Sequence, residues 1–145
     1  MNRLQIVNDE PDIVGNNNAR RISIIRQYVR DNISEDLSLN VLADFVYFNP
    51  TYLSRLFKKQ TGTTLISYIN NVRVEKAKEL LHDPHVKIHD VGVAVGVQSS
   101  SYFTQFFKKA TGQSPQDYRD SILLQLVIKK SNLESLRVSN SINTE

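Results

Sequence analysis

The sequence predicts an all-α protein in which a long connector helix joins two helix-turn-helix units, about seven helices in total. The first observation is a capped segment with one apolar and one polar face, NPTYLSRLFKKQTG at 49–62. The second is its repetition fifty positions later as SSSYFTQFFKKATGQSP at 99–115. The third is the spacing of apolar residues at three and four along most of the chain, which is the helical period. Two copies are too few for a solenoid, so they indicate two similar units side by side.

Composition bounds the protein to one domain or two small ones. The chain has 145 residues, of which 40% are hydrophobic, enough to bury a core, and 23% are charged. A net charge of +3 is only weak support for a polyanionic partner. The distribution of charge says more, because the windows 45–74 and 91–116 contain four and two cations, respectively, and no carboxylate. Such local segregation is the electrostatic footprint of a surface that binds nucleic acid.

Several classes of function are excluded or disfavoured by the residues present. The absence of cysteine excludes disulfides, thiolate zinc sites and cysteine nucleophiles, and it fits a cytoplasmic protein. The N-terminus lacks the apolar core of a signal peptide, and no apolar run approaches the roughly 18 residues of a membrane helix. No glycine-rich phosphate loop or serine elbow occurs, so the sequence predicts neither an enzyme nor a cofactor. His82, His85 and His89 lie close together, but Pro84 interrupts any helix between them, so no metal site is predicted.

The first part of the chain predicts a linker followed by the first unit. Residues 1–18 are polar and are predicted to be a linker or N-terminal arm. Residues 19–63 form the predicted first unit, which begins with a helix of its own. Ser38 then caps a short helix, and after a tight turn Asn49 caps another helix that Gly62 ends. A short helix, a tight turn and a helix with one polar face are the helix-turn-helix pattern.

The second part of the chain predicts a connector, a second unit and a tail. Residues 64–83 are the predicted connector helix, which at ~1.5 Å per residue is roughly 27 Å long. One turn of B-DNA rises about 34 Å, so a rigid connector would hold two reading helices at the separation of successive major grooves. Residues 84–124 are the predicted second unit, which ends in a short helix after Ser114. Residues 125–145 lack aromatic residues and a strong period and are predicted to be a loose tail. The apolar run 122–128 is either a dimer seam or, as we expect, part of the packing of the last helix.

The repeated helices share a polar front that carries hydrogen-bonding and cationic groups and no carboxylate. A stiff helix with such a front and an apolar back is what entry into a DNA major groove requires. Arg55 can form a bidentate contact with guanine and Gln105 one with adenine, or each can be an ordinary solvated side chain. The phenylalanines and tyrosines of both copies can form a stacking platform for single strands, but their helical spacing favours a core. The two fronts consist of Thr51, Ser54, Arg55 and Lys58, and of Ser101, Thr104, Gln105 and Lys108.

Taken together, these residues resemble the AraC/XylS family of transcription regulators over roughly residues 20–122. The resemblance is specific, because many residue types coincide at fixed spacing in two units. In the first unit and the connector it is carried by Leu42, Ala43, Asn49, Pro50, Tyr52, Leu53, Ser54, Arg55, Phe57, Lys58, Gly62, Tyr68, Arg73, Ala77, Leu80 and Leu81. In the second unit it is carried by Ile88, Asp90, Val91, Val95, Gly96, Ser99, Ser101, Tyr102, Phe103, Phe106, Phe107, Lys108, Lys109, Gly112, Ser114, Pro115, Tyr118 and Arg119.

The resemblance implies a DNA-binding domain of about seven helices, with homeodomain-like units, that binds double-stranded DNA sequence-specifically and regulates transcription as a bacterial activator. It implies that base contacts come from Thr51, Ser54, Arg55, Ser100, Ser101, Thr104 and Gln105. It implies that phosphate contacts come from Asn49, Lys58, Lys59, Lys108 and Lys109, with solvated surface charge as the alternative. The implied partners are double-stranded DNA, RNA polymerase and a sensor or receiver domain missing from this chain. We expect a monomer or weak dimer without membrane contact.

Two residues of the second unit depart from the family pattern. Gly92 stands where the family usually has alanine, and Val97 where it usually has phenylalanine. A glycine within a helix costs about 1 kcal/mol relative to alanine, and a missing ring removes part of a core. We therefore expect a looser second unit with weaker base reading, in line with neutral Gln105 at the place of Arg55. The weakly charged second front keeps an alternative function open, a helical protein-interaction module that has lost DNA binding.

Overall fold

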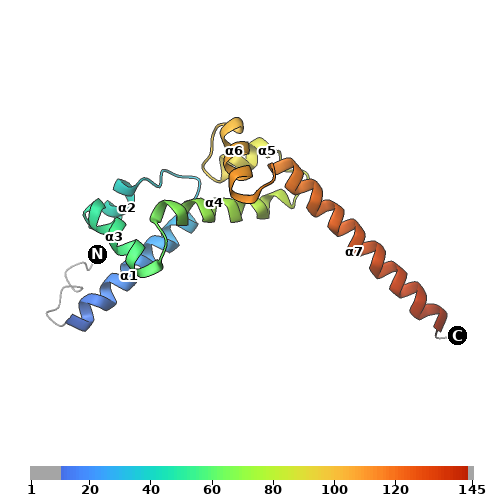
Figure 1. Cartoon of the computed structure of the whole chain (residues 1–145), viewed down its shortest axis with the longest axis horizontal. Helices are drawn as coiled ribbons and strands as arrows, with labels where there is room; N and C mark the ends of the chain where they lie inside the picture. The colour runs from blue at the N-terminus through green and yellow to red at the C-terminus, as the bar shows by residue number, and fades with distance from the viewer. Residues whose placement is uncertain (1–10, 144–145) are drawn as a thin grey trace. The chain divides into compact units, whose positions relative to one another are not determined.

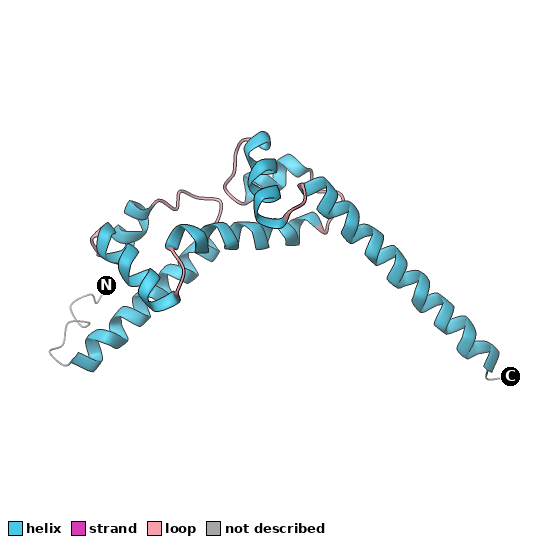
Figure 2. Ribbon diagram, in the orientation of Figure 1, coloured by secondary structure: helices cyan, strands magenta, loops and turns pink. Residues whose placement is uncertain are grey.

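The computed structural model describes residues 11–143, which form seven α-helices and no strand (Figure 2). The predicted all-α fold and the expected number of helices are therefore confirmed. The chain divides into two compact units, residues 1–75 and 76–145, which we call unit 1 and unit 2. The division falls within helix α4 (Leu65–Leu81). None of the helices in the described range is long and apolar enough to cross a membrane.

Unit 1 is built from α1 (Pro11–Asp31), α2 (Leu39–Phe45), α3 (Pro50–Thr61) and the first part of α4 (Figure 1). Its core consists of apolar side chains at helical spacing, as the periodicity predicts. Helix α3 packs on α1 and α2 through its apolar back, which leaves its polar front outward. The buried residues of this core are Ile22, Ile25, Val29, Ile33, Leu37, Leu42, Ala43, Val46, Leu53, Leu56, Phe57, Leu65 and Ile69.

The ends of α3 are set by the residues that the sequence predicts. The Oδ1 atom of Asn49 accepts hydrogen bonds from the backbone N–H groups of Thr51 at 2.9 Å and Tyr52 at 3.4 Å. Pro50 occupies the first position of the helix, where a backbone N–H would have no helical partner. Gly62 ends the helix at a φ of 81°, a left-handed conformation that suits glycine. Helix α3 thus carries its own start and stop signals.

Unit 2 repeats this arrangement with α5 (Ile88–Ala94), α6 (Ser100–Thr111) and the first turns of α7 (Pro115–Asn143). Ser99 caps α6 through its Oγ atom, which accepts a backbone N–H at 3.3 Å, and Gly112 ends the helix at a φ of 83°. Ser99 and Gly112 therefore correspond to Asn49 and Gly62 of the first copy. The side chains buried in this unit include Ala77, Leu81, Val91, Val95, Val97, Phe103, Phe107 and Pro115.

The duplication extends to individual side-chain contacts. The Oγ1 atom of Thr61 donates to the carbonyl oxygen of Phe57 at 2.7 Å. In unit 2 the Oγ1 atom of Thr111 donates in the same way to the carbonyl oxygen of Phe107 at 2.9 Å. Each of these phenylalanines packs on a tyrosine of the following helix, with ring centroids 5.5 Å apart. The C-terminal ends of α3 and α6 are therefore held by the same two contacts, a threonine hydrogen bond and a phenylalanine–tyrosine packing contact.

Arg119 is a buried cation that closes the loop between α4 and α5. Its guanidinium donates to the carbonyl oxygens of Leu81 at 3.0 Å, Asp83 at 3.0 Å and Val86 at 2.6 Å. These carbonyls lie at and beyond the end of α4, where helical carbonyls lack intrahelical partners. In the same loop the backbone N–H of His85 donates to the Asp83 carboxylate and lowers the pKa of that carboxyl below its ordinary value of 3.8. The resulting stabilisation is present above pH 3.8 and is lost as the pH falls through the lowered pKa.

The N-terminal part of the chain differs from the sequence prediction. The helix predicted to begin at residue 19 begins at Pro11, so residues 11–18 of the predicted linker are helical. The side-chain amide of Asn18 donates to the hydroxyl of Tyr52 at 3.2 Å, which ties this extension to α3. Glycine and asparagine weaken a helix by about 1 kcal/mol per residue at most, so a tertiary contact can outweigh their preference. The rest of the predicted arm, residues 1–10, lies outside the described residues.

The C-terminal part differs as well, because the predicted loose tail at 125–145 is helical up to Asn143. No proline or glycine follows Pro115, so no residue in this stretch stops the helix. The described side chains from Leu124 onward are exposed. Most of the apolar run 122–128 is therefore unpacked, and the expectation that the last helix buries it is wrong.

The departure at Gly92 is explained by another difference between the units, the phenylalanine at position 103. A Cβ atom on Gly92 would lie 3.0 Å from Cγ of Phe103 and 3.0 Å from the carbonyl oxygen of Val97. Gly92 therefore makes room for the ring of Phe103, which is fully buried. The expectation of a looser second unit stays a prediction. When the two units are aligned on their turns and helix caps, Gly92 matches Ala43 of unit 1. Val97 matches Phe48, and Phe103 matches Leu53.

Candidate nucleic-acid interface

Helix α3 presents an exposed polar strip on the side opposite its buried leucines. Thr51, Ser54 and Arg55 are exposed, whereas Leu53 and Leu56 are buried. This alternation follows from the helical period. Within residues 11–143, no side-chain hydrogen bond or ion pair engages these three polar residues. Their donors and acceptors are therefore available to a ligand that approaches this face of unit 1.

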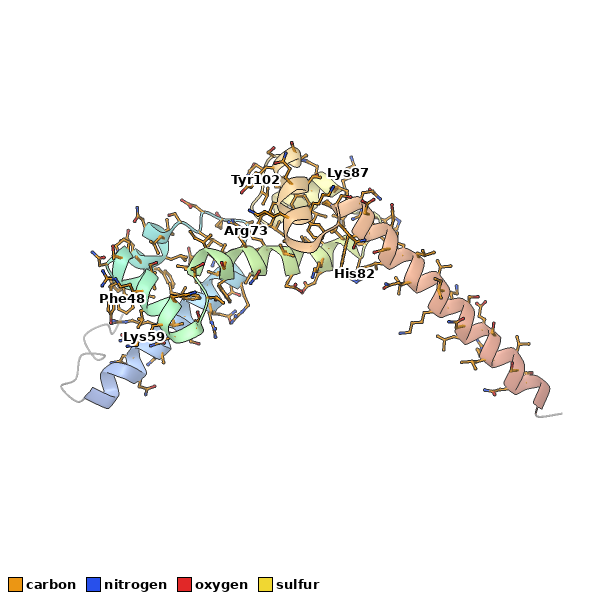
Figure 3. All side chains as sticks on the ribbon, in the orientation of Figure 1. Phe48, Lys59, Arg73, His82, Lys87 and Tyr102 are labelled. Atoms are coloured by element: carbon orange, nitrogen blue, oxygen red, sulfur yellow. The ribbon has the colours of Figure 1, made fainter. Side chains whose placement is uncertain are left out.

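Lys58 and Lys59 continue this strip toward the end of α3, and the side chain of Lys59 is labelled in Figure 3. Both lysines are exposed, and neither is in a salt bridge within the described part of the chain. The window 45–74 has no carboxylate, so their positive field is not cancelled by sequence neighbours. Cations in the last turn also stabilise the helix through its dipole. Phosphate binding and helix stabilisation are compatible roles for this pair.

Asn49 lies at the start of the strip and caps α3. The cap uses only the Oδ1 atom, which accepts two backbone N–H groups. The amide NH₂ group of Asn49 remains a donor that can reach an anion beside the helix N-terminus, where the helix dipole favours negative charge. The predicted phosphate contact is thus compatible with the capping role.

Helix α6 presents the corresponding strip in unit 2. Ser101 and Gln105 are exposed, and no described side-chain hydrogen bond engages them. Thr104 is half-buried, and its hydroxyl donates to the carbonyl oxygen of Ser100 at 3.0 Å. Thr104 can therefore offer a DNA base only its hydroxyl oxygen and its methyl group. A methyl group suits contact with the methyl group of thymine. Ser100 is exposed, and its Oγ atom lies 2.6 Å from Nδ1 of His89 on α5.

The positive charge of the second strip is confined to its end. Lys108 and Lys109 are exposed in the last turn of α6 and are in no described salt bridge. The middle of the strip carries the neutral amide of Gln105, where the strip of α3 carries the guanidinium of Arg55. Because charged donors form stronger hydrogen bonds than neutral ones, the first strip has the stronger potential contact with a base.

Three residues at or beside these strips are not predicted there by the sequence. His89 has no predicted role in the sequence, whereas in the structure it contacts the first residue of α6. Tyr52 and Tyr102 are expected in the core but are 46% and 60% exposed. Each tyrosine follows directly on a residue of the polar front, so its place at the border of the strip could be found from the helical period. Figure 3 labels Tyr102 on α6.

The three histidines have different partners. Nδ1 of His82 lies 2.6 Å from the carbonyl oxygen of Lys78, and Nδ1 of His85 lies 3.2 Å from the carboxylate of Asp83. His89 contacts α6 instead. Among the described residues, no three histidine, cysteine or acidic side chains are arranged to hold a metal ion.

Both strips combine groups that read base edges with groups that bind phosphate. Hydroxyl groups lie in the first turns of each helix, a guanidinium lies in the middle of α3 and an amide in the middle of α6, and lysines lie at the end of both. Guanidinium and amide groups can form paired hydrogen bonds with guanine and adenine in the major groove. Ammonium groups fix a protein on the duplex without reading its sequence. This order of groups along a helix suits insertion into a major groove.

The part of the chain that contains both strips is similar to one kind of domain in known proteins. A family model described as a helix-turn-helix domain matches residues 42–121. Among relatives, the bifunctional transcriptional activator/DNA repair enzyme AdaA of Bacillus subtilis is 40% identical over 98 residues, 68% of this chain. The arabinose operon regulatory protein of Escherichia coli is 31% identical over 120 residues, 82% of this chain. Among solved structures, the C-terminal domain of AraT, a response regulator from Geobacillus stearothermophilus, is similar with a TM-score of 0.67 at 38% identity, over 70% of this chain and 84% of that one.

These matches cover only part of each curated relative and part of this chain. The chain spans less than half the length of the two curated relatives, 46% of AdaA and 40% of the arabinose regulator. The family model covers more than half of the chain, from α2 to the first turns of α7. All of α1 and the extension of α7 lie outside it. The matched stretch contains both polar strips and both caps.

Proposed function

Because this chain belongs to the AraC/XylS family of helix-turn-helix transcription regulators and carries its DNA-binding domain, we propose that it binds double-stranded DNA sequence-specifically. In this proposal α3 enters one major groove and α6 the next, and binding regulates transcription. The observation that carries the proposal is the pair of exposed polar strips, each on a helix with a buried apolar back. The continuity of α4 (Leu65–Leu81) supports the use of both strips on one duplex.

The residues of the two strips divide the work between base reading and positioning. We propose that base contacts come from Thr51, Ser54 and Arg55 in unit 1, and from the polar residues in the first turns and middle of α6 in unit 2. The exposure of Thr51, Ser54, Arg55, Ser101 and Gln105, none of which has a described side-chain hydrogen bond, supports this assignment. Phosphate contacts come from the lysines at the end of each strip and from the amide of Asn49. The residues assigned to α6 and its end are Ser100, Ser101, Thr104, Gln105, Lys108 and Lys109.

The test of this function combines selection with salt titration. The full chain is used to select duplexes from a random pool, and its affinity for the selected duplex is measured as the salt concentration rises. Each phosphate that a lysine or arginine neutralises contributes a slope of about −0.9 to log K against log salt. Four or five such contacts predict a slope of about −4. If no duplex is bound even at low salt, DNA binding is refuted.

We propose further that the regulation is activation and that it acts through contact with RNA polymerase. The relative AdaA is a transcriptional activator, which supports this proposal. The match to a response regulator supports a sensor or receiver domain as an additional partner. Such a function belongs in the bacterial cytoplasm. A reporter gene placed behind the selected duplex should be transcribed more strongly when the chain is expressed, and unchanged or lower transcription would contradict activation.

We propose that the chain acts by binding rather than by catalysis. One relative is a bifunctional transcriptional activator and DNA repair enzyme, whereas this chain has no cysteine and therefore no thiolate that could accept a group from damaged DNA. Incubation with alkylated duplex should therefore leave the mass of the protein unchanged. A stable mass increase would contradict the proposal.

A second candidate function is protein interaction, and the extension of α7 favours it. Leu124 is 60% exposed, Val127 64% and Ile128 51%, although each is a residue that proteins normally bury. An apolar helix of this kind is suited to packing against another helix. The salt titration separates the two candidates, because protein contacts through leucine and valine depend little on salt. Self-association without duplex binding would favour the second.

A further inference from the structure

His89 and Ser100 form a polar pair at the start of the second reading helix. His89 lies in the first turn of α5, and Ser100 is the first residue of α6. Nδ1 of His89 is 2.6 Å from Oγ of Ser100, and both side chains are exposed. We propose that His89 is a positioning residue for DNA reading, because its protonation decides whether Ser100 offers the duplex a donor or an acceptor. This inference rests on the proposed function of α6.

The two states of the pair follow from the chemistry of imidazole. A neutral histidine with its proton on Nε2 has a lone pair on Nδ1, so the Ser100 hydroxyl donates to it. Ser100 then faces the duplex with lone pairs only, which suits the amino groups of adenine and cytosine. A protonated histidine has no acceptor, so Nδ1–H donates and the hydroxyl proton of Ser100 turns outward. It can then donate to a phosphate oxygen or to the acceptor atoms of guanine.

Few charged residues lie near the pair along α5 and α6. Histidine is the side chain whose charge changes between about pH 5 and 8. Asp90 follows His89 on α5, Lys87 is the N-cap of that helix, and the only charged residues of α6, Lys108 and Lys109, lie at its far end.

Within residues 11–143 no hydrogen bond or ion pair joins His89 to a carboxylate of the helix that packs on α6. The first two turns of α7 carry Asp117, Arg119 and Asp120. Arg119 is engaged with three carbonyl oxygens, and the carboxylate of Asp120 accepts from Gln116 at 2.9 Å. Asp117 lies in the first turn of α7. In this proposal a phosphate of the bound duplex beside the start of α6 supplies an anion that stabilises protonated His89.

The pair is a property of unit 2 and not of the duplicated fold. In register with the turn that follows, unit 1 has Asn40 at the place of His89 and Pro50 at the place of Ser100. A proline side chain has no hydrogen-bonding group, so unit 1 cannot form this contact. The fold therefore does not require it, and its place beside a predicted base-contacting residue gives it a role in recognition.

The experiment measures affinity for the selected duplex by fluorescence anisotropy from pH 5.5 to 8.0 at constant ionic strength. We expect wild type to bind roughly three- to tenfold more tightly at pH 5.5, the effect of one added exposed charge beside a phosphate. His89→Gln should remove this difference. Ser100→Ala should keep the part that comes from charge, but the preferred base at one position should no longer change between selections at the two pH values. His82→Gln and His85→Gln are matched controls, because both lie in unit 2 outside the α6 strip.

Several outcomes overturn the inference. It fails if His89→Gln keeps the wild-type pH response, or if either control removes that response instead. It also fails if the base preference of Ser100→Ala still shifts with pH as in wild type. Imidazole ¹⁵N shifts of wild type, with and without duplex, give a measurement that needs no variant, and DNA must increase the protonated fraction of His89. If wild type binds duplex with the expected salt slope, the proposed function survives any of these failures, whereas absence of duplex binding removes both.

Discussion

Arg55 and Lys58 lie about one turn apart on the exposed strip of α3, and their chemistry suits different tasks. The guanidinium is a planar fork that matches the two acceptors of guanine, whereas the ammonium is a compact charge that suits any phosphate. Arg55→Ala should weaken binding to the selected duplex by roughly 5- to 100-fold and leave random duplex little changed, since a bidentate base contact contributes about 1–3 kcal/mol of discrimination. Lys58→Ala should weaken both duplexes alike and reduce the salt slope by about 1.

The matched control for both substitutions is Lys130→Ala on the extension of α7, which removes one exposed cation outside the family match. Competition footprinting on selected and random duplex measures the division of labour. Equal losses on the two duplexes for both α3 variants would contradict it.

Tyr47 adopts a backbone conformation that unit 2 assigns to glycine. Its φ is 60°, and the corresponding Gly96 in the turn of unit 2 has a φ of 86°. A non-glycine residue in this region carries about 1–3 kcal/mol of strain. Tyr47 is 48% exposed, so removal of its ring loses only part of a buried side chain. Tyr47→Gly should therefore stabilise unit 1 by about 1 kcal/mol, and Gly96→Ala should destabilise unit 2 by at least as much.

Native-state hydrogen exchange of the amides of α2 and α5 measures the free energy of opening of each unit separately. Faster exchange of α2 in Tyr47→Gly would show that the contacts of the tyrosine ring exceed the strain. That result would also identify Tyr47 as part of the core and not only of the turn.

At the scale of the helix-turn-helix element, the tight fit of Gly92 against Phe103 predicts coupling between the two positions. Gly92→Ala gains helix propensity of about 1 kcal/mol, but its methyl group would press on the ring of Phe103 and on a backbone carbonyl. We expect a net loss of about 1–2 kcal/mol in the free energy of unfolding of unit 2. Phe103→Leu alone should lose a similar amount through the cavity that it leaves.

The double variant restores the residue types of unit 1 at these places, Ala43 and Leu53. It should therefore lose less than the sum of the two single losses, with a coupling of at least about 0.5 kcal/mol. Urea denaturation of the four proteins measures this cycle. If the two single losses of unfolding free energy simply add in the double variant, the side chains at positions 92 and 103 do not compete for the same volume.

The elements that could be predicted are those with local start and stop signals. The starts of α2, α3 and α6 follow from Ser38, Asn49 and Ser99, whose side chains accept backbone N–H groups. The ends of α3 and α6 follow from glycines at positive φ. The polar strips follow from the helical period. The assignment of individual residues to bases and phosphates stays a prediction.

The features that could not be predicted depend on contacts distant in sequence. The start of α1 is tied by a hydrogen bond between Asn18 and Tyr52, which lie far apart in the chain. The pair of His89 and Ser100 joins two helices across a turn. For the end of α7, serine and asparagine predict a loop by propensity, whereas the absence of a proline or glycine stop lets the helix continue.

At the scale of the whole molecule, the extension of α7 predicts weak association between two copies of the chain. Leu126, Leu133 and Leu136 are spaced as a heptad seam and are 52%, 55% and 60% exposed. Covering six half-exposed leucines in a pair contributes about 6 kcal/mol, whereas association costs about 4–15 kcal/mol. Lys129 lies on the same side of the helix and repels its copy. A stable dimer in free solution is therefore not expected.

Two chains on adjacent DNA sites would meet at a much higher effective concentration. Leu133→Ser should therefore reduce cooperativity on a duplex with two sites and leave the affinity for a single site unchanged. Val138→Ser is the matched control, since Val138 is 59% exposed but lies off the seam. Gel-shift titration of the doubly and singly occupied duplex measures the effect. Equal cooperativity in wild type and Leu133→Ser would refute the seam.

The caps of α3 and α6 have a practical consequence for engineering. Each reading helix lies between a polar side chain that starts it and a glycine that ends it, and these signals are contained within residues 49–62 and 99–112. We therefore expect such a stretch to form the same helix when it is placed in another member of the family. Transplanting one between members of the family, with the inward-facing apolar positions kept, should change which promoter is recognised without redesign of the scaffold.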